Sequence, residues 1–457
     1  MFWLEFREVL SARWQGILAC ARGRWWSAFG ALILGGSPTE ICSHPRPGSG
    51  RTVPDAAPPV QHRPVANQAT RVAIIVAVAH GINDAYASFV PPLLPRIMGN
   101  LGLSIASAAT LSVTFAIAAS LPQPLFGFLA DRFGRRIFAV AGPLVAAVFV
   151  TAIGFATSYW VLVLCLLMGG IGSAAFHPPG ASYAVRVSEG KGGGKRYSIF
   201  SFGGSLGFAI GPLVAVALVQ WGGMGRLWVA VIPAALIMPL FYFGLPSGRA
   251  EARQAKPPPP PSVVLRHLRG PLGLIFGISA TMAFVQRAFL TMEPIIVADM
   301  GGSEALGAVT LTIYLAAQSV GTVAGGVLAD RMDRRKLLIH LCSWALPAHL
   351  LAVWIGPLGG LGLAAAACAG FLGMATLPPI VVMAQELVPD GAAATSGVVM
   401  GLAWATGSVF VLGTGALADV IGPQFATLLS MPMIGLAILL AMHPALKHTW
   451  GSATADP

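Results

Sequence analysis

Apolar residues fill most of the chain between residues 71 and 443, where they form twelve continuous runs separated by short polar connections. A transmembrane helix needs roughly 20 such residues, and no run shows the ten-residue alternation of a transmembrane β-strand. The pattern predicts an all-α membrane protein with twelve transmembrane helices. The predicted spans cover residues 71–96, 105–130, 136–156, 159–186, 196–221, 226–245, 271–298, 305–330, 336–355, 358–387, 393–419 and 423–443.

The polar segments outside these spans predict the division of the chain. Residues 1–70 contain seven Arg, no Lys and a Pro-rich stretch, and we expect a disordered tail, an upstream extension or an interfacial amphipathic segment. Residues 247–270 are the one long polar connection and are expected to form a linker between two halves, 71–246 and 271–445. Residues 446–457 are expected to form a second tail.

Composition excludes several classes of protein. Charged residues make up 10% of the chain and apolar residues 56%, with a mean hydropathy of +0.75, whereas a soluble protein has about 25% charged residues. The five Cys show no spacing typical of a metal site or a disulfide framework. Neither a nucleophile with a base nor a Gly-rich phosphate loop is evident, so we expect no enzyme, no metal and no cofactor.

The net charge of +11 is a topology signal. Lys and Arg gather on alternate connections, while the opposite side offers only Arg96 and Arg226. Short cytoplasmic loops are enriched in Lys and Arg, so we expect both termini in the cytoplasm, in a multi-pass inner (plasma) membrane protein that does not bind nucleic acid. The basic residues of these connections are Arg132, Arg135, Arg136; Arg186, Lys191, Lys195, Arg196; Arg249, Arg253, Lys256, Arg266, Arg269; and Arg331, Arg334, Arg335, Lys336.

An internal repeat relates the two halves. The segment 129–136, LADRFGRR, closes the second span, and 328–335, LADRMDRR, closes the eighth, at an offset of 199 residues. The same offset brings Pro178 and Pro179 to within one residue of Pro378 and Pro379. Two six-helix pseudo-repeats are therefore predicted. Paired repeats with a substrate site near the midplane are the architecture of alternating-access carriers.

These segments resemble the loop 2/3 signature of the major facilitator superfamily, and the resemblance implies the major facilitator fold. The first copy fills every expected position, whereas Asp333 replaces the expected Gly in the second. In this family the motif implies a gate, because an acid at a helix end can accept hydrogen bonds that lock one closed state; the alternative is that these Arg only enforce topology. The motif residues are Gly127, Asp131, Arg132, Gly134, Arg135 and Arg136, and then Gly326, Asp330, Arg331, Arg334 and Arg335.

Residues 75–215 also resemble the fosmidomycin-resistance type of drug exporter. The resemblance rests on His80, Asn83 and Asp84 in the first span, Gln123-Pro124 in the second, Phe176-His177-Pro178 in the fourth, and Ser198, Phe200 and Gly203-Gly204 in the fifth. It implies export of small drug-like molecules.

Polar side chains inside the first span are candidates for proton coupling. His80, Asn83 and Asp84 share one helical face because they are three and four residues apart. A charge near the bilayer centre costs about 2.5 to 3.5 kcal/mol, so an acid there is a functional candidate by default. The alternative is a structural network that ties this span to its neighbours.

Other polar residues inside spans are weaker candidates for the cavity. Arg287 needs a partner, which is Asp84, Glu293 or an anionic group of a substrate; a structural ion pair is the alternative. We expect Pro178 and Pro179 to interrupt the fourth span beside His177, as a gate or as a local hydrogen bond. Gln123 and Gln318 each place an amide in an apolar run.

Glycines recur every four residues in the fifth span, at Gly203, Gly207 and Gly211, and Pro212 follows. Small residues at this spacing let two helices approach closely. Part of this segment resembles the antiporter signature of the superfamily, which favours export.

We therefore predict a monomeric secondary carrier in the lipid bilayer that exports small molecules with the proton gradient as its energy source. Proton-coupled uptake of an organic anion or a sugar is the nearest alternative, and a receptor or scaffold without transport is the alternative from another class.

Overall fold

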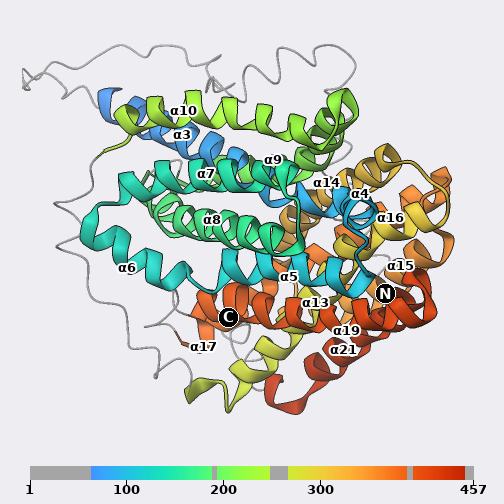
Figure 1. The fold of residues 1–457 in the computed structure, drawn as a ribbon. Coiled ribbons are helices and arrows are strands. Elements are labelled where there is room, and N and C mark those ends of the chain that lie inside the picture. The colour runs from blue at the N-terminus through green and yellow to red at the C-terminus, as the bar shows by residue number, and fades with distance from the viewer. Residues whose placement is uncertain (1–62, 188–192, 247–265, 389–394, 448–457) are drawn as a thin grey trace, which may run out of the picture. The chain divides into compact units, whose positions relative to one another are not determined.

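The computed structural model describes residues 63–187, 193–246, 266–388 and 395–447, and these residues are helical with no strand (Figure 1). Most of the predicted tails 1–70 and 446–457 and of the linker 247–270 lie outside the described residues, so these boundaries stay predictions. Figure 1 shows the first half, blue to green, and the second half, yellow to red, as two neighbouring groups of helices.

Twelve helical segments of the described residues are long and apolar enough to cross a membrane, which confirms the predicted fold class. The first half contains α3 (Arg63–Ala87) with α4 (Val90–Leu101), α5 (Ile105–Ser120) with α6 (Gln123–Phe133), α7 (Arg135–Ala152), α8 (Tyr159–Val187), α9 (Gly193–Gly222), and η2 (Met224–Ala230) with α10 (Val231–Gly244). The second half contains α13 (Pro271–Asp299), α14 (Glu304–Ala329), α15 (Arg334–Ile355), α16 (Gly360–Ala375) with α17 (Leu377–Leu387), η4 (Gly397–Leu402) with α19 (Ala403–Ile421), and α20 (Pro423–Ser430), η5 (Met431–Met433) and α21 (Ile434–Met442).

Prolines interrupt some spans but not the one expected. New helices start with Pro in their first positions after breaks at Ser88–Phe89, Leu121–Pro122 and Thr376. The expected interruption at Pro178 and Pro179 is wrong, because α8 continues through both. A transmembrane helix tolerates Pro where neighbouring helices and local adjustments satisfy the freed backbone groups.

Local geometry repeats between the halves at the offset found in the sequence. Gly102 and Gly301 both have positive φ, at 62° and 76°, and the next helix starts in each half with a Ser N-cap, Ser104 or Ser303. The halves differ at Gly134, which has φ of 112°, because its counterpart Asp333 instead caps α15 by accepting a hydrogen bond from Lys336 N. The missing Gly of the second motif copy thus reflects a different turn.

The helix-packing glycines Gly203, Gly207 and Gly211 lie against α3. A side-chain carbon added at Gly207 would overlap the carbonyl oxygen of Gly81, and additions at Gly203 and Gly211 would overlap the carbonyl oxygens of Ala77 and Ala85. The backbones of α3 and α9 therefore approach so closely that only hydrogen fits between them. This seam holds the first span, with its polar residues, in place.

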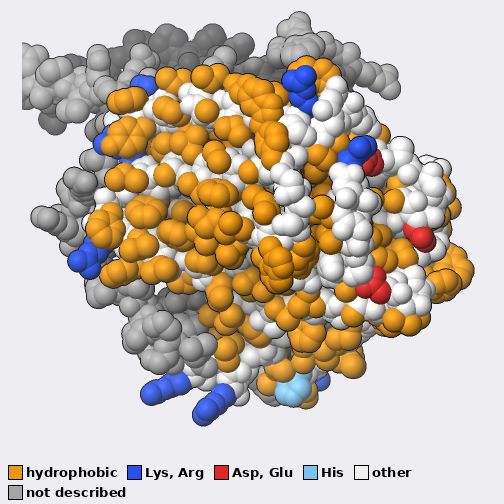
Figure 2. Space-filling view, viewed as in Figure 1, with side chains coloured by type: hydrophobic (Ala, Val, Ile, Leu, Met, Phe, Trp, Pro, Cys, Tyr) orange, Lys and Arg blue, Asp and Glu red, His pale blue; other side chains and the backbone are white. Residues whose placement is uncertain are grey.

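The outer surface suits a lipid environment. Figure 2 shows a face made mostly of hydrophobic side chains, with Lys and Arg toward its margins. Large apolar side chains are highly exposed, including Trp160 at 75% and Phe243 at 83%. An exposed apolar surface of this extent marks a membrane or a partner interface rather than a water-facing one.

Candidate functional site

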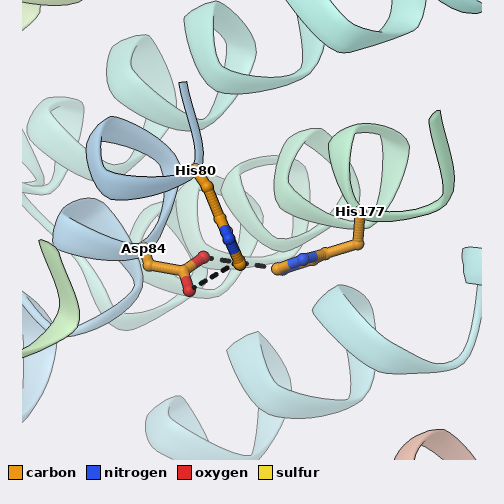
Figure 3. Close-up of side chains that lie close together, drawn as sticks. All are labelled: His80, Asp84 and His177. Atoms are coloured by element: carbon orange, nitrogen blue, oxygen red, sulfur yellow. Dashed lines mark ion pairs between the residues drawn. The ribbon is translucent and has the colours of Figure 1, made fainter. Parts of the chain in front are cut away.

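Three titratable side chains meet inside the first half. His80 and Asp84 come from adjacent turns of α3, and His177 reaches them from α8 (Figure 3). Asp84 Oδ2 lies 3.2 Å from His80 Nε2, and Asp84 Oδ1 lies 3.6 Å from His177 Nε2. The structure thus brings together two predicted residues of span one with the predicted His of span four. We call His80, Asp84 and His177 the central cluster.

Neighbouring groups fix the orientation of the central cluster. Asn83 Nδ2 lies 3.0 Å from both Asp84 Oδ1 and Ser173 Oγ, and donates to them. The His80 ring stacks on Phe200 with centroids 4.3 Å apart. Gly204 leaves the space that this ring fills, since a side-chain carbon there would overlap it.

The contacts of His80 suit a proton shared with Asp84. His80 Nδ1 lies 3.0 Å from the carbonyl oxygen of Phe200, which can only accept, so Nδ1 carries a hydrogen. Nε2 then faces a carboxylate oxygen at 3.2 Å. A bare lone pair and an ionised carboxylate would repel each other at this distance. A proton on Nε2 or on Asp84 turns this contact into a hydrogen bond.

Among the described residues, the central cluster is a group that could hold a metal ion, because its three ligand atoms lie within 4.8 Å of one another. One proton between His80 Nε2 and Asp84 Oδ2 would satisfy this contact. We therefore interpret the cluster as a proton-binding one.

Arg287 lies apart from the predicted acidic partners. The described ion pairs include none between Arg287 and Asp84 or Glu293, so the first two expected partners are not found at contact distance. Instead its guanidinium carbon lies 5.6 Å from the centre of the Trp404 ring. Arg287 Nε is buried and has no hydrogen-bond partner.

Arg287 lines a small cleft of about 20 Å³ between the two halves. Its walls come from α3, α4 and α5 of the first half and from α13 and α19 of the second. Ser112 Oγ, which also lines the cleft, is buried without a hydrogen-bond partner. We call this space the central cleft.

Glu293 is buried elsewhere on α13, with 3% of its surface exposed. Both of its carboxylate oxygens are buried without a hydrogen-bond partner, and none of the described ion pairs involves it. It is therefore an acid separate from the central cluster.

Other predicted cavity residues form local or second-half contacts. Gln123 Nε2 donates to Ala119 O of the preceding turn, which is a local contact. Gln318 Nε2 donates to Gln286 Oε1 at 2.7 Å, linking α14 to α13. His349 of α15 is not among the residues predicted from the sequence; it is fully buried, with Nε2 3.3 Å from the Tyr314 hydroxyl. His349 is an ionisable residue inside a predicted span, which is the same signal that indicated His80.

The motif residues make charged contacts within their own halves. Asp131 pairs with Arg135 at 2.7 Å, and Arg334 pairs with Glu386 at 2.6 Å. Arg136 donates to the carbonyl oxygens of Tyr242 and Leu245 near the end of α10, and its counterpart Arg335 donates to Met442 O at the end of α21.

The gate predicted from this motif requires a contact between halves, and no hydrogen bond or ion pair of the described motif residues makes one in this structure. The remaining motif positions do not change this. Arg132 lies over the Phe133 ring, Asp330 and Arg331 are exposed, and Gly127 and Gly326 pack near Pro178 and Pro378 respectively. The gate therefore stays a prediction for another conformation.

Two polar contacts join the halves at the opposite ends of the spans, the face predicted to be external. Arg96 of α4 donates two hydrogen bonds, of 2.7 and 2.8 Å, to the carboxylate of Glu304 at the start of α14. Asp419 near the end of α19 accepts from the backbone nitrogens of Ile105 and Ala106 at 2.7 and 3.1 Å. A carboxylate at a helix N-terminus is stabilised by the unpaired N–H groups and by the helix dipole. These contacts close the predicted external face.

Comparison with known proteins agrees with this architecture. Residues 76–410 match the family model of the Major Facilitator Superfamily. The chain is 27% identical over 412 residues to the uncharacterized MFS-type transporter YfnC of Bacillus subtilis, covering 87% of this chain and 99% of YfnC. It is 26% identical over 360 residues to the fosmidomycin resistance protein of Escherichia coli, covering 75% of this chain and 85% of that protein.

A solved structure shows the same fold. A bacterial homolog of the human lysosomal transporter Spinster, in an inward-facing and unoccupied conformation, superposes with a TM-score of 0.71 at 16% identity, covering 84% of this chain and 99% of the homolog.

Proposed function

The chain belongs to the Major Facilitator Superfamily, and from this premise we propose that it is a proton-coupled carrier that exports small drug-like molecules by alternating access. It is a multi-pass membrane transporter and not an enzyme. The proposal places it in the inner membrane with both termini in the cytoplasm, because Lys and Arg gather on the connections expected to face the cytoplasm.

The observation that supports proton coupling is the contact between His80 and Asp84, whose geometry suits a proton shared between Nε2 and the carboxylate. Intramembrane acids and histidines mark proton relays in transporters. The cluster is formed by α3 and α8 of the first half, and alternating access would open it to each side of the membrane in turn. Loss of the proton would leave the Nε2 lone pair facing the ionised carboxylate. The protonated and deprotonated forms of the carrier would therefore differ in energy.

Export is favoured by the relatives, since a fosmidomycin resistance protein and, at 28% identity over 58% of this chain, a chloramphenicol resistance protein of Streptomyces lividans are among them. Uptake of an organic anion is kept as a second candidate because Arg287 lies in the central cleft without an acidic partner.

The transport proposal is tested in everted membrane vesicles loaded with a pH-sensitive dye. Once respiration has acidified the interior, fosmidomycin or chloramphenicol should cause proton efflux from vesicles that contain the protein, because an exporter moves substrate inward and protons outward in this orientation. Vesicles without the protein are the control. Proton-driven accumulation of substrate in right-side-out vesicles would replace export by uptake, and substrate movement without proton movement would remove the coupling.

Alternating access predicts that the Arg96–Glu304 ion pair holds the external face closed. Glu304→Gln should increase the outward-open population by about 1.4- to 5-fold, since partly exposed ion pairs contribute about 0.2–1 kcal/mol. The measurement is the labelling rate of a cysteine introduced at Ala109, a fully buried position on α5, by a membrane-impermeant maleimide in a background without native cysteines. Glu386→Gln is the matched control, because it removes the acid of an Arg pair that lies inside one half. Equal labelling rates in both variants would show that the pair does not hold this face.

A further inference from the structure

The central cleft contains a cation whose partner is missing from the protein. Arg287 is the only charged residue among those that line this cleft, and its Nε is buried without a hydrogen-bond acceptor. Ser112, on the facing helix α5, has a buried hydroxyl oxygen that is likewise unpartnered. Two polar groups from different halves of the molecule thus border the same space with hydrogen-bonding capacity left over.

Burying an unpaired cation is costly, so the protein must gain something from Arg287. The Trp404 ring at 5.6 Å offsets part of the cost through a cation–π contact. Asp84 forms short contacts with the two histidines and no described ion pair with Arg287. The Arg287 guanidinium therefore has N–H groups that can donate hydrogen bonds to the oxygen atoms of a ligand in the cleft.

We propose that Arg287, together with Ser112, binds the anionic group of the transported substrate, a carboxylate or a phosphonate. Arg presents its N–H groups as a planar fork that matches the oxygens of these groups. The cleft volume of about 20 Å³ admits the oxyanion of a ligand, and the rest of the molecule would extend out of the cleft.

This inference rests on the proposed function, in that it assigns the substrate class of a carrier, but it holds for either direction of transport. The substrate would be a small amphiphilic organic anion. Its charge would take the place of the protein acid predicted from the sequence as a partner of Arg287.

The test compares benzoate with benzamide, a neutral molecule of the same shape, by calorimetric titration of the purified full-length protein. Wild type should bind benzoate at least about tenfold more tightly than benzamide, because hydrogen bonds to charged groups are the stronger class. Arg287→Gln should remove this preference, and Arg287→Lys should weaken benzoate binding because an ammonium lacks the planar fork. Ser112→Ala should weaken benzoate binding several-fold without altering a charge.

The matched control is Arg226→Gln, which removes an exposed Arg that lies 4.8 Å from the centre of the Trp221 ring, away from the cleft. This variant should keep the benzoate preference. The inference is overturned if wild type binds benzamide as tightly as benzoate, or if Arg287→Gln retains the preference. If benzoate binding depends on Arg287 but substrate moves no proton in the vesicle assay, the anion site stands and proton coupling is removed. If substrate moves protons but the protein has no preference for benzoate, proton coupling stands and the anion site is removed.

Discussion

Asp84→Asn should abolish uphill, proton-coupled transport while leaving a folded protein in the membrane. Asn has nearly the shape of the protonated acid, so the hydrogen bonds with His80 and Asn83 can be kept in altered form. The variant cannot ionise, however, and a cluster that holds a fixed charge state cannot exchange a proton between the two sides of the membrane. Energy-independent exchange of substrate should survive, because it needs no net proton transfer.

The measurement is substrate accumulation in everted vesicles with and without a proton gradient, at matched expression. Asp299→Asn is the control, since it makes the same chemical change at an exposed position at the end of α13. A purely structural role of Asp84 would lower expression, binding and exchange together. Gradient-driven accumulation at the wild-type level in Asp84→Asn would remove Asp84 from the coupling mechanism, and Glu293 would be the next acid to replace.

Among the described glycines near the central cluster, replacement of Gly207 by Ala should destabilise the folded protein most. The new carbon would overlap the carbonyl oxygen of Gly81, so α3 and α9 would have to separate. Overpacking of this kind costs typically about 1–3 kcal/mol, and a clash with backbone relaxes less readily than one with a side chain. The central cluster would also shift, because His80 and Asp84 lie on α3.

Thermal unfolding of the detergent-purified protein measures this effect. Gly435→Ala in α21 is the matched control, because a side-chain carbon at Gly435 would meet nothing within 4 Å. An unchanged melting temperature in Gly207→Ala, with full transport activity, would show that the close approach of α3 and α9 is not required.

The twelve spans and the two related halves could be predicted because both depend on properties written directly in the sequence. A span needs only length and apolarity, and the repeated motif, with its offset of 199 residues, marks the same turn in both halves. The contact of Gly207 with α3 followed from the spacing of small residues, although the identity of the partner helix required the structure.

The details of the site could be predicted only in part, because they depend on contacts between distant segments. The face shared by His80 and Asp84 is a local helical property, but the approach of His177 depends on the packing of α8 against α3. The missing partner of Arg287 could not be predicted, since sequence spacing does not give the distance to Asp84 or Glu293. The continuation of α8 through Pro178 likewise depends on neighbouring helices rather than on the proline itself.

The central claim is that the coupling proton is held between His80 and Asp84. The most direct test adds a compound that the vesicle assay shows to be transported to purified protein in weakly buffered detergent solution, and records the change in pH. The proposed mechanism predicts proton release from wild type and none from Asp84→Asn; proton uptake by wild type that is also lost in the mutant would keep the site and reverse the direction of transport. An equal proton change in wild type and Asp84→Asn would contradict the claim.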